Sequence, residues 1–392
     1  MGFQKIKEEV FYVGVQDWDR RTFDELIPLP GGTSYNAYVI RGSEKTALID
    51  AVDPPKIEML LSNLRQLGIS KLDYIISNHA EQDHSGGIPY LLEMYHDAVV
   101  VTNSKCKTFL QDLLHIPDEK FLEINHEDTL SLGDRTLKFL LAAWVHWPET
   151  MFTYLEENAI LFSGDLFGSH LASSELFVRD EAKVYFAAKR YFAEIMMPFR
   201  TNIQKHMQKL KDLDIKIIAP THGQVYDNPE FILEQYEEWT SNHVDNKVLI
   251  PYISMHGSVE RMVNYLVEKL TDHGITVIPF NISVTDIGEF AMELVDAATV
   301  VVASSTVHVG PHPKMVYATY LTNMLRPKAK FASIIGSFGW GSRMVDNIKN
   351  ILTNFKGELL EPVISKGFPD EEVFQELDKL ADAIAQKHKE IH

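Results

Sequence analysis

The first half of the chain is dominated by short runs of apolar residues separated by turn-forming residues such as Gly133-Asp134. Runs of this length that are rich in β-branched and aromatic residues predict β-strands. Helical spacing of apolar positions appears between them, at residues 57–67 and 88–95, and then over 181–199 and 200–213. Strands that first pair in hairpins and then mix with helices predict two sheets covered by helices. The predicted strands are 11–15, 35–40, 46–50, 74–77, 98–102, 136–142, 151–155 and 160–163.

From residue 248 onward the pattern becomes a regular alternation of apolar strand and amphipathic helix. Five such βα units predict a doubly wound parallel sheet. A charged and then polar stretch at 231–247 precedes them, so we place one domain at 1–245 and a second at 246–392. The predicted strands are 248–253, 277–281, 299–303, 330–336 and 359–363, and the predicted helices are 259–273, 289–297, 316–325, 343–355 and 370–389.

Composition narrows the classes of protein to which the chain can belong. Its 392 residues exceed one ordinary core, which favours two or three domains. The formal net charge of -18 argues against nucleic-acid and anionic-membrane partners, and no apolar run has the length of a membrane span. The single cysteine, Cys106, excludes an intrachain disulfide and a Cys-ligated iron–sulfur or rubredoxin centre. With no signal-peptide pattern at the start, we expect a cytoplasmic protein.

The segment running from His79 to His84 carries the densest set of metal-ligand side chains in the chain. It places His79, Glu81, Asp83 and His84 within six positions, directly after the apolar run 72–76. A solvated charged loop is the alternative interpretation. Two imidazoles and two carboxylates at the end of a buried strand instead predict most of a two-metal site.

Three further ligand-type residues have the same placement after an apolar run. His146 follows 139–145, Asp165 follows Gly164, and His222 precedes Gly223. Each one taken alone is more often an ordinary loop or core residue. Their recurrence at successive strand ends favours a shared metal site.

This order resembles the metallo-β-lactamase superfamily, whose His-x-His-x-Asp-His loop binds zinc. Here Glu81 replaces the second histidine. That replacement, with His146-Trp-Pro-Glu-Thr-Met151 and Ser163-Gly-Asp165, resembles the flavodiiron proteins, also called A-type flavoproteins, as do Tyr35-Asn-Ala-Tyr38 and Asp17-Trp-Asp19. The resemblance covers essentially the whole chain. It implies an α/β fold with an N-terminal metallo-β-lactamase-like αββα sandwich and a C-terminal flavodoxin-like doubly wound parallel sheet.

The resemblance also implies a ligand set for two iron ions. His79, Glu81 and His146 would hold one iron, Asp83, His84 and His222 the other, and Asp165 would bridge them. A carboxylate is a harder ligand than an imidazole, which suits iron in both oxidation states, whereas zinc has no redox chemistry to gain from it. In some family members the histidine equivalent to His84 points away from the metal. His170 is either an outer residue that orients a ligand or donates a proton, or a plain surface histidine.

The second half contains a candidate phosphate loop, Ser254-Met-His-Gly-Ser258, between a strand and a helix. Backbone N–H groups and hydroxyls at such a helix start suit phosphate. The loop resembles the Thr-x-Thr-Gly-x-Thr loop of flavodoxins, with Val259 where the last hydroxyl is usual. No Gly-x-Gly-x-x-Gly follows the first strand, which argues against NAD or FAD bound in that way.

Two more loops, 304–310 and 337–341, are expected at the same sheet edge, where flavodoxin-like proteins bind FMN. Trp340 is placed either to stack on the flavin ring or to pack as a half-exposed aromatic. The residues expected to contact FMN are Ser254, Met255, His256, Gly257, Ser258, Val259, Ser304, Ser305, Thr306, Val307, His308, Ser337, Phe338, Gly339, Trp340 and Gly341.

The resemblance implies an FMN- and diiron-dependent oxidoreductase that reduces dioxygen to water, nitric oxide to nitrous oxide, or both. No catalytic side chain beyond the metal ligands is expected. Family members form head-to-tail homodimers, so we expect a homodimer or homotetramer. Without a rubredoxin centre in this chain, electrons would come from an external donor such as rubredoxin or a reduced deazaflavin. Two alternatives remain: a zinc hydrolase fused to a flavodoxin-like module, and a flavodoxin-type electron carrier with a degenerate metal domain.

Overall fold

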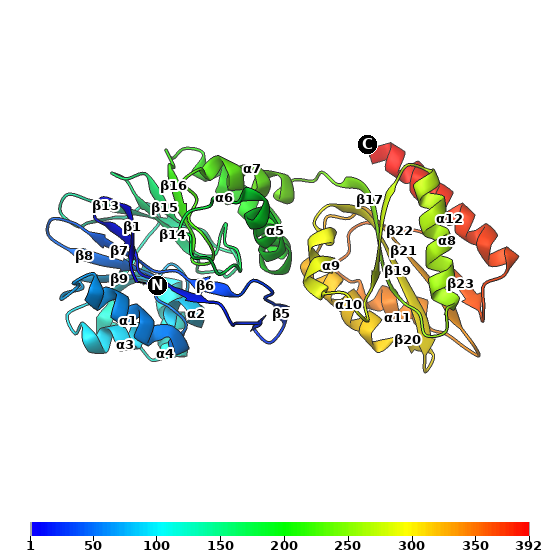
Figure 1. Ribbon diagram of the computed structural model, residues 1–392, viewed down its shortest axis with the longest axis horizontal. Helices are drawn as coiled ribbons and strands as arrows, with labels where there is room; N and C mark the ends of the chain where they lie inside the picture. The colour runs from blue at the N-terminus through cyan, green and yellow to red at the C-terminus, as the bar shows by residue number, and fades with distance from the viewer. Residues whose placement is uncertain (1, 392) are drawn as a thin grey trace. The chain divides into compact units, whose positions relative to one another are not determined.

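The computed structural model describes residues 2–391, which form two compact units (Figure 1). Of the described residues, the first unit contains those up to 192 and 199–240, and the second contains 193–198 and 241–391. Among the described residues, no helix combines the length and apolar character needed to cross a membrane.

The first unit contains two sheets that face each other. One has seven strands in the order β1-β2-β7-β8-β9-β10-β11, and the other has five in the order β12-β13-β14-β15-β16. The first sheet is built from β1 (Gln4–Lys7), β2 (Val10–Tyr12), β7 (Tyr38–Arg41), β8 (Thr46–Ile49), β9 (Tyr74–Ile76), β10 (Val99–Asn103) and β11 (Phe121–Ile124). The second is built from β12 (Thr129–Ser131), β13 (Thr136–Leu141), β14 (Met151–Leu155), β15 (Ile160–Phe162) and β16 (Ile217–Ala219).

Alternation along the strands explains why the sheets pack on both faces. In β8, Leu48 points to a core beneath helices, while its neighbours Ala47 and Ile49 point to the core between the sheets. Ile75 and Ile76 of β9 divide in the same way. Successive strand side chains point to opposite faces, so a strand that is apolar at every position is buried on both sides.

Helices cover the outer faces of both sheets and complete the αββα sandwich. Residues of α1 (Ile57–Gln66), α3 (Ile88–Met94) and α4 (Ser104–Leu114) share a core with the seven-stranded sheet. Figure 1 places α5 (Glu181–Tyr191), α6 (Arg200–Leu210) and α7 (Pro229–Thr240) beside the other sheet. Between α5 and α6 the chain follows a π-helix, Phe192–Met196, and a short 3₁₀ turn, Met197–Phe199. Short elements fill the connections: β3 (Val15–Asp17), β4 (Thr22–Phe23), β5 (Ile27–Pro28), β6 (Thr33–Tyr35), η1 (Pro54–Lys56), α2 (Gln82–Ser85) and η2 (Asp118–Lys120).

The second unit is a parallel sheet with helices on both faces, as predicted. Its order is β18-β17-β19-β21-β22, the 2-1-3-4-5 order of flavodoxin-like folds. The strands are β17 (Asp245–Ile253), β18 (Thr276–Asn281), β19 (Ala297–Val307), β21 (Phe331–Phe338), β22 (Glu358–Leu359) and β23 (Val363–Lys366), with β20 (Gly310–Pro311) paired back onto β19. Figure 1 places α8 (Ser258–Asp272) and α12 (Glu371–Ile391) on one face, and α9 (Ile287–Leu294), α10 (Pro313–Leu325) and α11 (Met344–Ile351) on the other.

Several predicted elements differ in detail from the structure. The strand expected at 35–40 is divided into β6 and β7 around buried Asn36, whose Nδ2 donates to Pro220 O and Gly223 O instead of to a sheet. The strand expected at 359–363 is likewise two short strands, β22 and β23. Residues 304–307 and 337–338, expected as loops, continue β19 and β21. The helix α4 was not predicted; it begins where the Asn103 side chain accepts a hydrogen bond from Cys106 N at 3.1 Å.

Candidate functional site

The seven predicted ligand residues come together at one end of the two sheets of the first unit. His79 follows β9, Glu81 precedes the short helix α2, and that helix carries Asp83 and His84. Of the other three, His146 lies in the connection from β13 to β14, Asp165 follows β15, and His222 follows β16. Because parallel strands carry their carboxyl ends to the same edge, β15 and β16 deliver Asp165 and His222 side by side.

We call His79, Glu81 and His146, together with Asp165, the first cluster. The Nε2 atoms of His79 and His146 lie 3.1 and 3.2 Å from Glu81 Oε2. The same two nitrogens lie 3.6 and 3.0 Å from Asp165 Oδ2. Ligand atoms about 2.1 Å from a shared ion and at right angles to each other lie about 3 Å apart, so these separations suit one ion.

We call Asp83, His84 and His222 the second cluster. Asp83 Oδ2 lies 3.3 Å from His84 Nε2 and 3.1 Å from His222 Nε2. Asp165 Oδ1 lies 2.9 and 3.6 Å from the same two nitrogens. Asp165 therefore turns one oxygen to each cluster, as a bridging carboxylate does. His84 faces the cluster in this chain.

Burial divides the seven side chains into an enclosed floor and a partly open rim. The side chains of His79, His84, His222 and Asp165 are at most 2% exposed, and that of Asp83 is 9% exposed. Glu81 and His146 are 17% and 15% exposed. A small molecule in the solvent therefore meets the first cluster before the second.

Opposite charges in this enclosed site stabilise one another. Burial alone lowers the pKa of His79, but its hydrogen bonds to Glu149 and Glu81 and the charge of Asp165 raise it well above its usual value. Burial also lowers the pKa of His84, and Asp165 with Asp83 raises it to about 9. Burial raises the pKa of Asp165, but the imidazoles of His84 and His146 hold it well below its usual range. The site therefore favours ionised carboxylates together with positive charge, which protons or metal ions supply.

Several polar atoms in the second cluster have no hydrogen bond. Both carboxylate oxygens of Asp83 and both ring nitrogens of His84 are buried and lack a hydrogen-bond partner among residues 2–391. They approach one another without hydrogen-bond geometry. Buried polar groups in native proteins are almost always satisfied, so converging polar atoms without a hydrogen-bond partner fit a site for a cation.

Residues outside the seven hold the ligands in place, a role that was not predicted for them. Glu149 Oε1 accepts a hydrogen bond from His79 Nδ1 at 2.7 Å. The carbonyl of Ser34 accepts from His222 Nδ1 at 2.6 Å, and Thr221 Oγ1 donates to Asp165 Oδ1 at 2.8 Å. Glu149 lies three residues after His146, and Thr221 directly precedes His222, which was the only signal in the sequence.

His170 is a buried residue at 8% exposure, so a plain surface histidine is excluded. Its Nδ1 lies 2.9 Å from Thr33 Oγ1, and its ring centroid lies 4.8 Å from that of His222. Burial, reinforced by the neighbouring His222, lowers the pKa of His170 well below its usual value. The residue therefore packs beside the second cluster as a neutral imidazole.

In the second unit, the three predicted loop segments meet at the carboxyl ends of adjacent strands. Ile253 at the end of β17 pairs with Ser304 of β19, and Ser305 pairs with Ser337 of β21. Ser305 Oγ accepts from Met255 N at 3.2 Å, which ties the first segment to the second. One edge of the sheet thus carries all three segments: Ser254, Met255, His256, Gly257, Ser258 and Val259; Ser304 to His308; and Ser337 to Gly341.

This edge has the features of an anion and ring site. Gly257 precedes α8 with a φ of +84°, and a Cβ placed there, or at Gly339 or Gly341, would meet nothing within 4 Å. The Ser254 hydroxyl is buried and has no partner among the described residues. Trp340 is 79% exposed, so its ring is free to cover a ligand.

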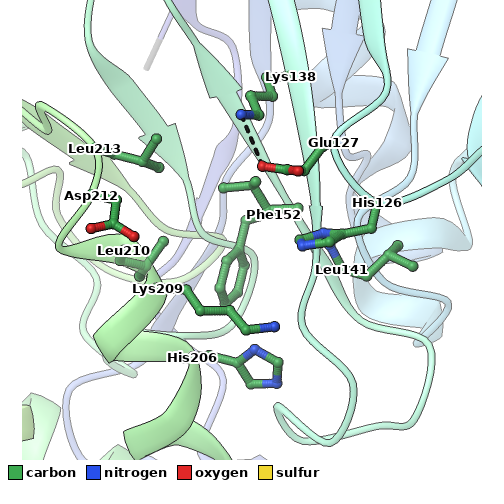
Figure 2. Close-up of a pocket in the computed structure, with 11 residues that line it drawn as sticks. His126, Glu127, Lys138, Leu141, Phe152, His206, Lys209, Leu210, Asp212 and Leu213 are labelled. Atoms are coloured by element: carbon green, nitrogen blue, oxygen red, sulfur yellow. Dashed lines mark hydrogen bonds and ion pairs between the residues drawn. The ribbon is translucent and has the colours of Figure 1, made fainter.

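A separate cavity of about 310 Å³ lies elsewhere in the first unit (Figure 2). Its apolar walls include Phe152, Leu210 and Leu213, and Figure 2 shows His126 and His206 at one side. It shares no residue with the two clusters, so it is not part of the metal site.

Known proteins are similar to this chain both over the metal-site region and over nearly its whole length. A family model described as "ODP family beta lactamase" matches residues 33–223, which include all seven ligand-type residues. A nitric oxide reductase of Moorella thermoacetica is 35% identical over 91% of this chain and 90% of its own length.

Solved structures match both units together. The rubredoxin oxygen:oxidoreductase of the anaerobe Desulfovibrio gigas superimposes with a TM-score of 0.95 and 30% identity, covering 99% of this chain and 98% of its own. The flavodiiron protein of Giardia intestinalis gives a TM-score of 0.87 and 29% identity, with the same two coverages of 99% and 98%. With a metal-ligand constellation, a flavodoxin-like unit and full-length relatives in agreement, this chain belongs to the flavodiiron protein family.

Proposed function

We propose that this protein is an FMN- and diiron-dependent reductase of dioxygen to water, of nitric oxide to nitrous oxide, or of both. The observation that carries the proposal is the pair of facing clusters that share Asp165. Relatives named for nitric oxide reduction and for oxygen reduction, similar over nearly the whole chain, support it.

The donor set fits two iron ions. His79, Glu81 and His146 would hold one and Asp83, His84 and His222 the other, with Asp165 between them. When bound, the irons supply electrons and open coordination positions for a small diatomic molecule, and FMN supplies a two-electron store. Three carboxylates among seven ligands suit ferric as well as ferrous iron, which favours this function over zinc hydrolysis.

The chain's own residues prepare this site by fixing where protons sit. His222 donates its Nδ1 proton to the Ser34 carbonyl, which leaves Nε2 free to face the second cluster. Thr221 donates to Asp165 Oδ1 and so holds the orientation in which the carboxylate turns an oxygen to each side. Ligands that are held before metal binding lose less entropy when they bind.

FMN would bind at the shared edge of the second unit. The phosphate would lie against the Ser254 hydroxyl and the backbone of residues 255–259, where the positive φ of Gly257 opens the turn at the start of α8. The ring would lie between the ends of β19 and β21, with Trp340 over it. Val259 is fully buried in the core below the loop, so it contributes backbone and no hydroxyl.

A paired assay tests the function. Protein purified without oxygen should contain about two iron ions and one FMN per chain, and should consume oxygen or nitric oxide when given reduced rubredoxin or a reduced deazaflavin. Two zinc ions, no iron and no turnover would contradict the proposal and favour a hydrolase.

We further propose a head-to-tail homodimer in which the FMN of one chain serves the irons of another. Mixing tests this directly: a variant expected to lack iron (His146→Ala) and one expected to lack FMN (Gly257→Val) should each be inactive alone. Mixed dimers should regain part of the activity, because the FMN of one chain meets the irons of the other. Mixed dimers as inactive as the separate variants would contradict the arrangement.

A further inference from the structure

We propose that Glu149 is a positioning residue that sets His79 as the strongest imidazole ligand and makes the two metal positions unequal. The inference rests on the proposed diiron function and concerns a residue outside the seven ligands. Glu149 is 2% exposed, so its carboxylate is held almost entirely within protein.

The contacts of Glu149 determine which nitrogen of His79 faces the metal. Its Oε1 accepts from His79 Nδ1 at 2.7 Å and from the backbone N of Ala80 at 3.0 Å. When a metal ion replaces the second proton of this ring, the remaining proton is thereby placed on Nδ1. Its Nε2, which lies 3.1 Å from Glu81 Oε2, keeps a free lone pair for a metal ion.

His79 differs from the other three imidazoles in this outer partner. The partner of His222 Nδ1 is the neutral carbonyl of Ser34, and His84 Nδ1 has no hydrogen bond within residues 2–391. The polar contacts of His146 all involve Nε2. Within residues 2–391, a carboxylate therefore accepts from the Nδ1 of one of these four rings only, and that ring belongs to the first cluster.

A carboxylate hydrogen-bonded to a ligating imidazole raises the donor strength of that ligand. A stronger donor favours the more positively charged metal. The iron of the first cluster should therefore bind more tightly and have a lower reduction potential than it would without Glu149. This is also the cluster with the partly exposed rim.

A second contact holds the backbone of Glu149 in place. The Glu149 carbonyl accepts from Asn103 Nδ2 at 2.7 Å, while Asn103 Oδ1 caps α4. This offers a control, because the backbone of Glu149 can be loosened without removing its charge. In Asn103→Ser the cap remains, since serine is also a good N-cap residue, but the bond to Glu149 is lost.

The test compares Glu149→Gln, Asn103→Ser and the unaltered protein, each freed of iron and titrated with ferrous iron against a chelator. Glutamine keeps the shape and an oxygen that can accept from both N–H groups, and it removes the charge. We expect Glu149→Gln to weaken one of the two irons about 10- to 100-fold and to raise its midpoint potential. Asn103→Ser should lower the melting temperature and leave iron affinity and potential unchanged.

Three results would overturn the inference. Glu149→Gln with unaltered iron affinity and unaltered potentials would show that the charge has no effect. An Asn103→Ser protein with the same losses as Glu149→Gln would assign the effect to backbone placement. An unaltered protein that takes up no iron would defeat the proposed function as well, whereas the first two results leave that function standing.

Discussion

At the residue scale, the site is a small group of buried, charged side chains that lie close together. The seven ligand-type residues could be predicted because their residue types are unusual at strand ends and because the 79–84 segment is so dense. Glu149, Ser34 and Thr221 were not predicted as supporting residues because their roles depend on contacts with partners up to 188 positions away. Such contacts leave no periodic or local pattern in a single sequence.

Replacing a ligand on the rim should separate metal binding from flavin binding. We expect Glu81→Ala and His146→Ala to lose iron and turnover, by at least about 10-fold, because each removes one donor from the first cluster. FMN content should stay at the level of the unaltered protein, since the flavin edge belongs to the other unit. Metal and flavin quantitation checks this, with the exposed Glu123→Ala as the control. Full activity in either ligand variant would contradict the site assignment.

The thiol of Cys106 gives a pH-dependent test of the core between the seven-stranded sheet and its helices. Burial raises the pKa of Cys106 to about 12, so about one thiol in 10,000 is ionised at pH 8. Alkylation at pH 8 should therefore be negligible in the native protein and fast after unfolding, with the exposed Ser283→Cys variant labelled at once as the control. The pKa of the Cys106 thiol in the folded protein lies above its unfolded value of about 8.5. The contribution of the buried neutral thiol to folding stability is therefore complete below about pH 8.5 and is lost as the pH rises towards 12.

At the scale of elements, apolar periodicity predicted most strands and helices because burial on both faces leaves long apolar runs. It placed 151–155 at the same bounds as β14. It failed where a strand ends early for a tertiary reason, as at Asn36, whose side chain bonds across to residues 220 and 223. It also missed α4, which buries Cys106 and Leu110 and whose start depends on the Asn103 cap.

The turn before α8 allows a matched pair of glycine variants. Gly257 and Gly274 both have a φ near +80°, lie at opposite ends of the same helix, and have open space where a Cβ would be added. Replacing either by alanine should therefore cost about 1–2 kcal/mol of stability from backbone strain. Only Gly257→Ala should also weaken FMN binding, which a flavin fluorescence titration measures. Equal FMN affinity in the two variants would exclude the Gly257 turn from the flavin site.

At the scale of the whole molecule, each unit has a hydrophobic core of its own. Among the described residues, two core clusters of the first unit lie within residues 6–225, and one of the second unit lies within 248–385. The parallel arrangement of the second sheet followed from its regular βα alternation, and its flavodoxin-like character from the family resemblance. The pairing order of the first unit's two sheets did not, because long-range pairing has no local signature in the sequence.

Because each unit has its own core, we expect two unfolding transitions that respond to different ligands. Adding FMN in 100-fold excess over its Kd should stabilise one transition by about 2.7 kcal/mol, and removing iron should lower only the other. Differential scanning calorimetry of the four forms, with and without each group, measures this. A single transition that responds equally to both groups would contradict independent units.

The contrast between the enclosed floor and the open rim has a preparative consequence. A chelator arriving from solvent reaches Glu81 and His146 first, whereas the side chains of His84 and His222 are 1% exposed. An ion in the first cluster should therefore exchange before an ion in the second cluster. Brief chelation followed by cobalt would then yield a mixed-metal protein, in which each ion carries its own spectroscopic label.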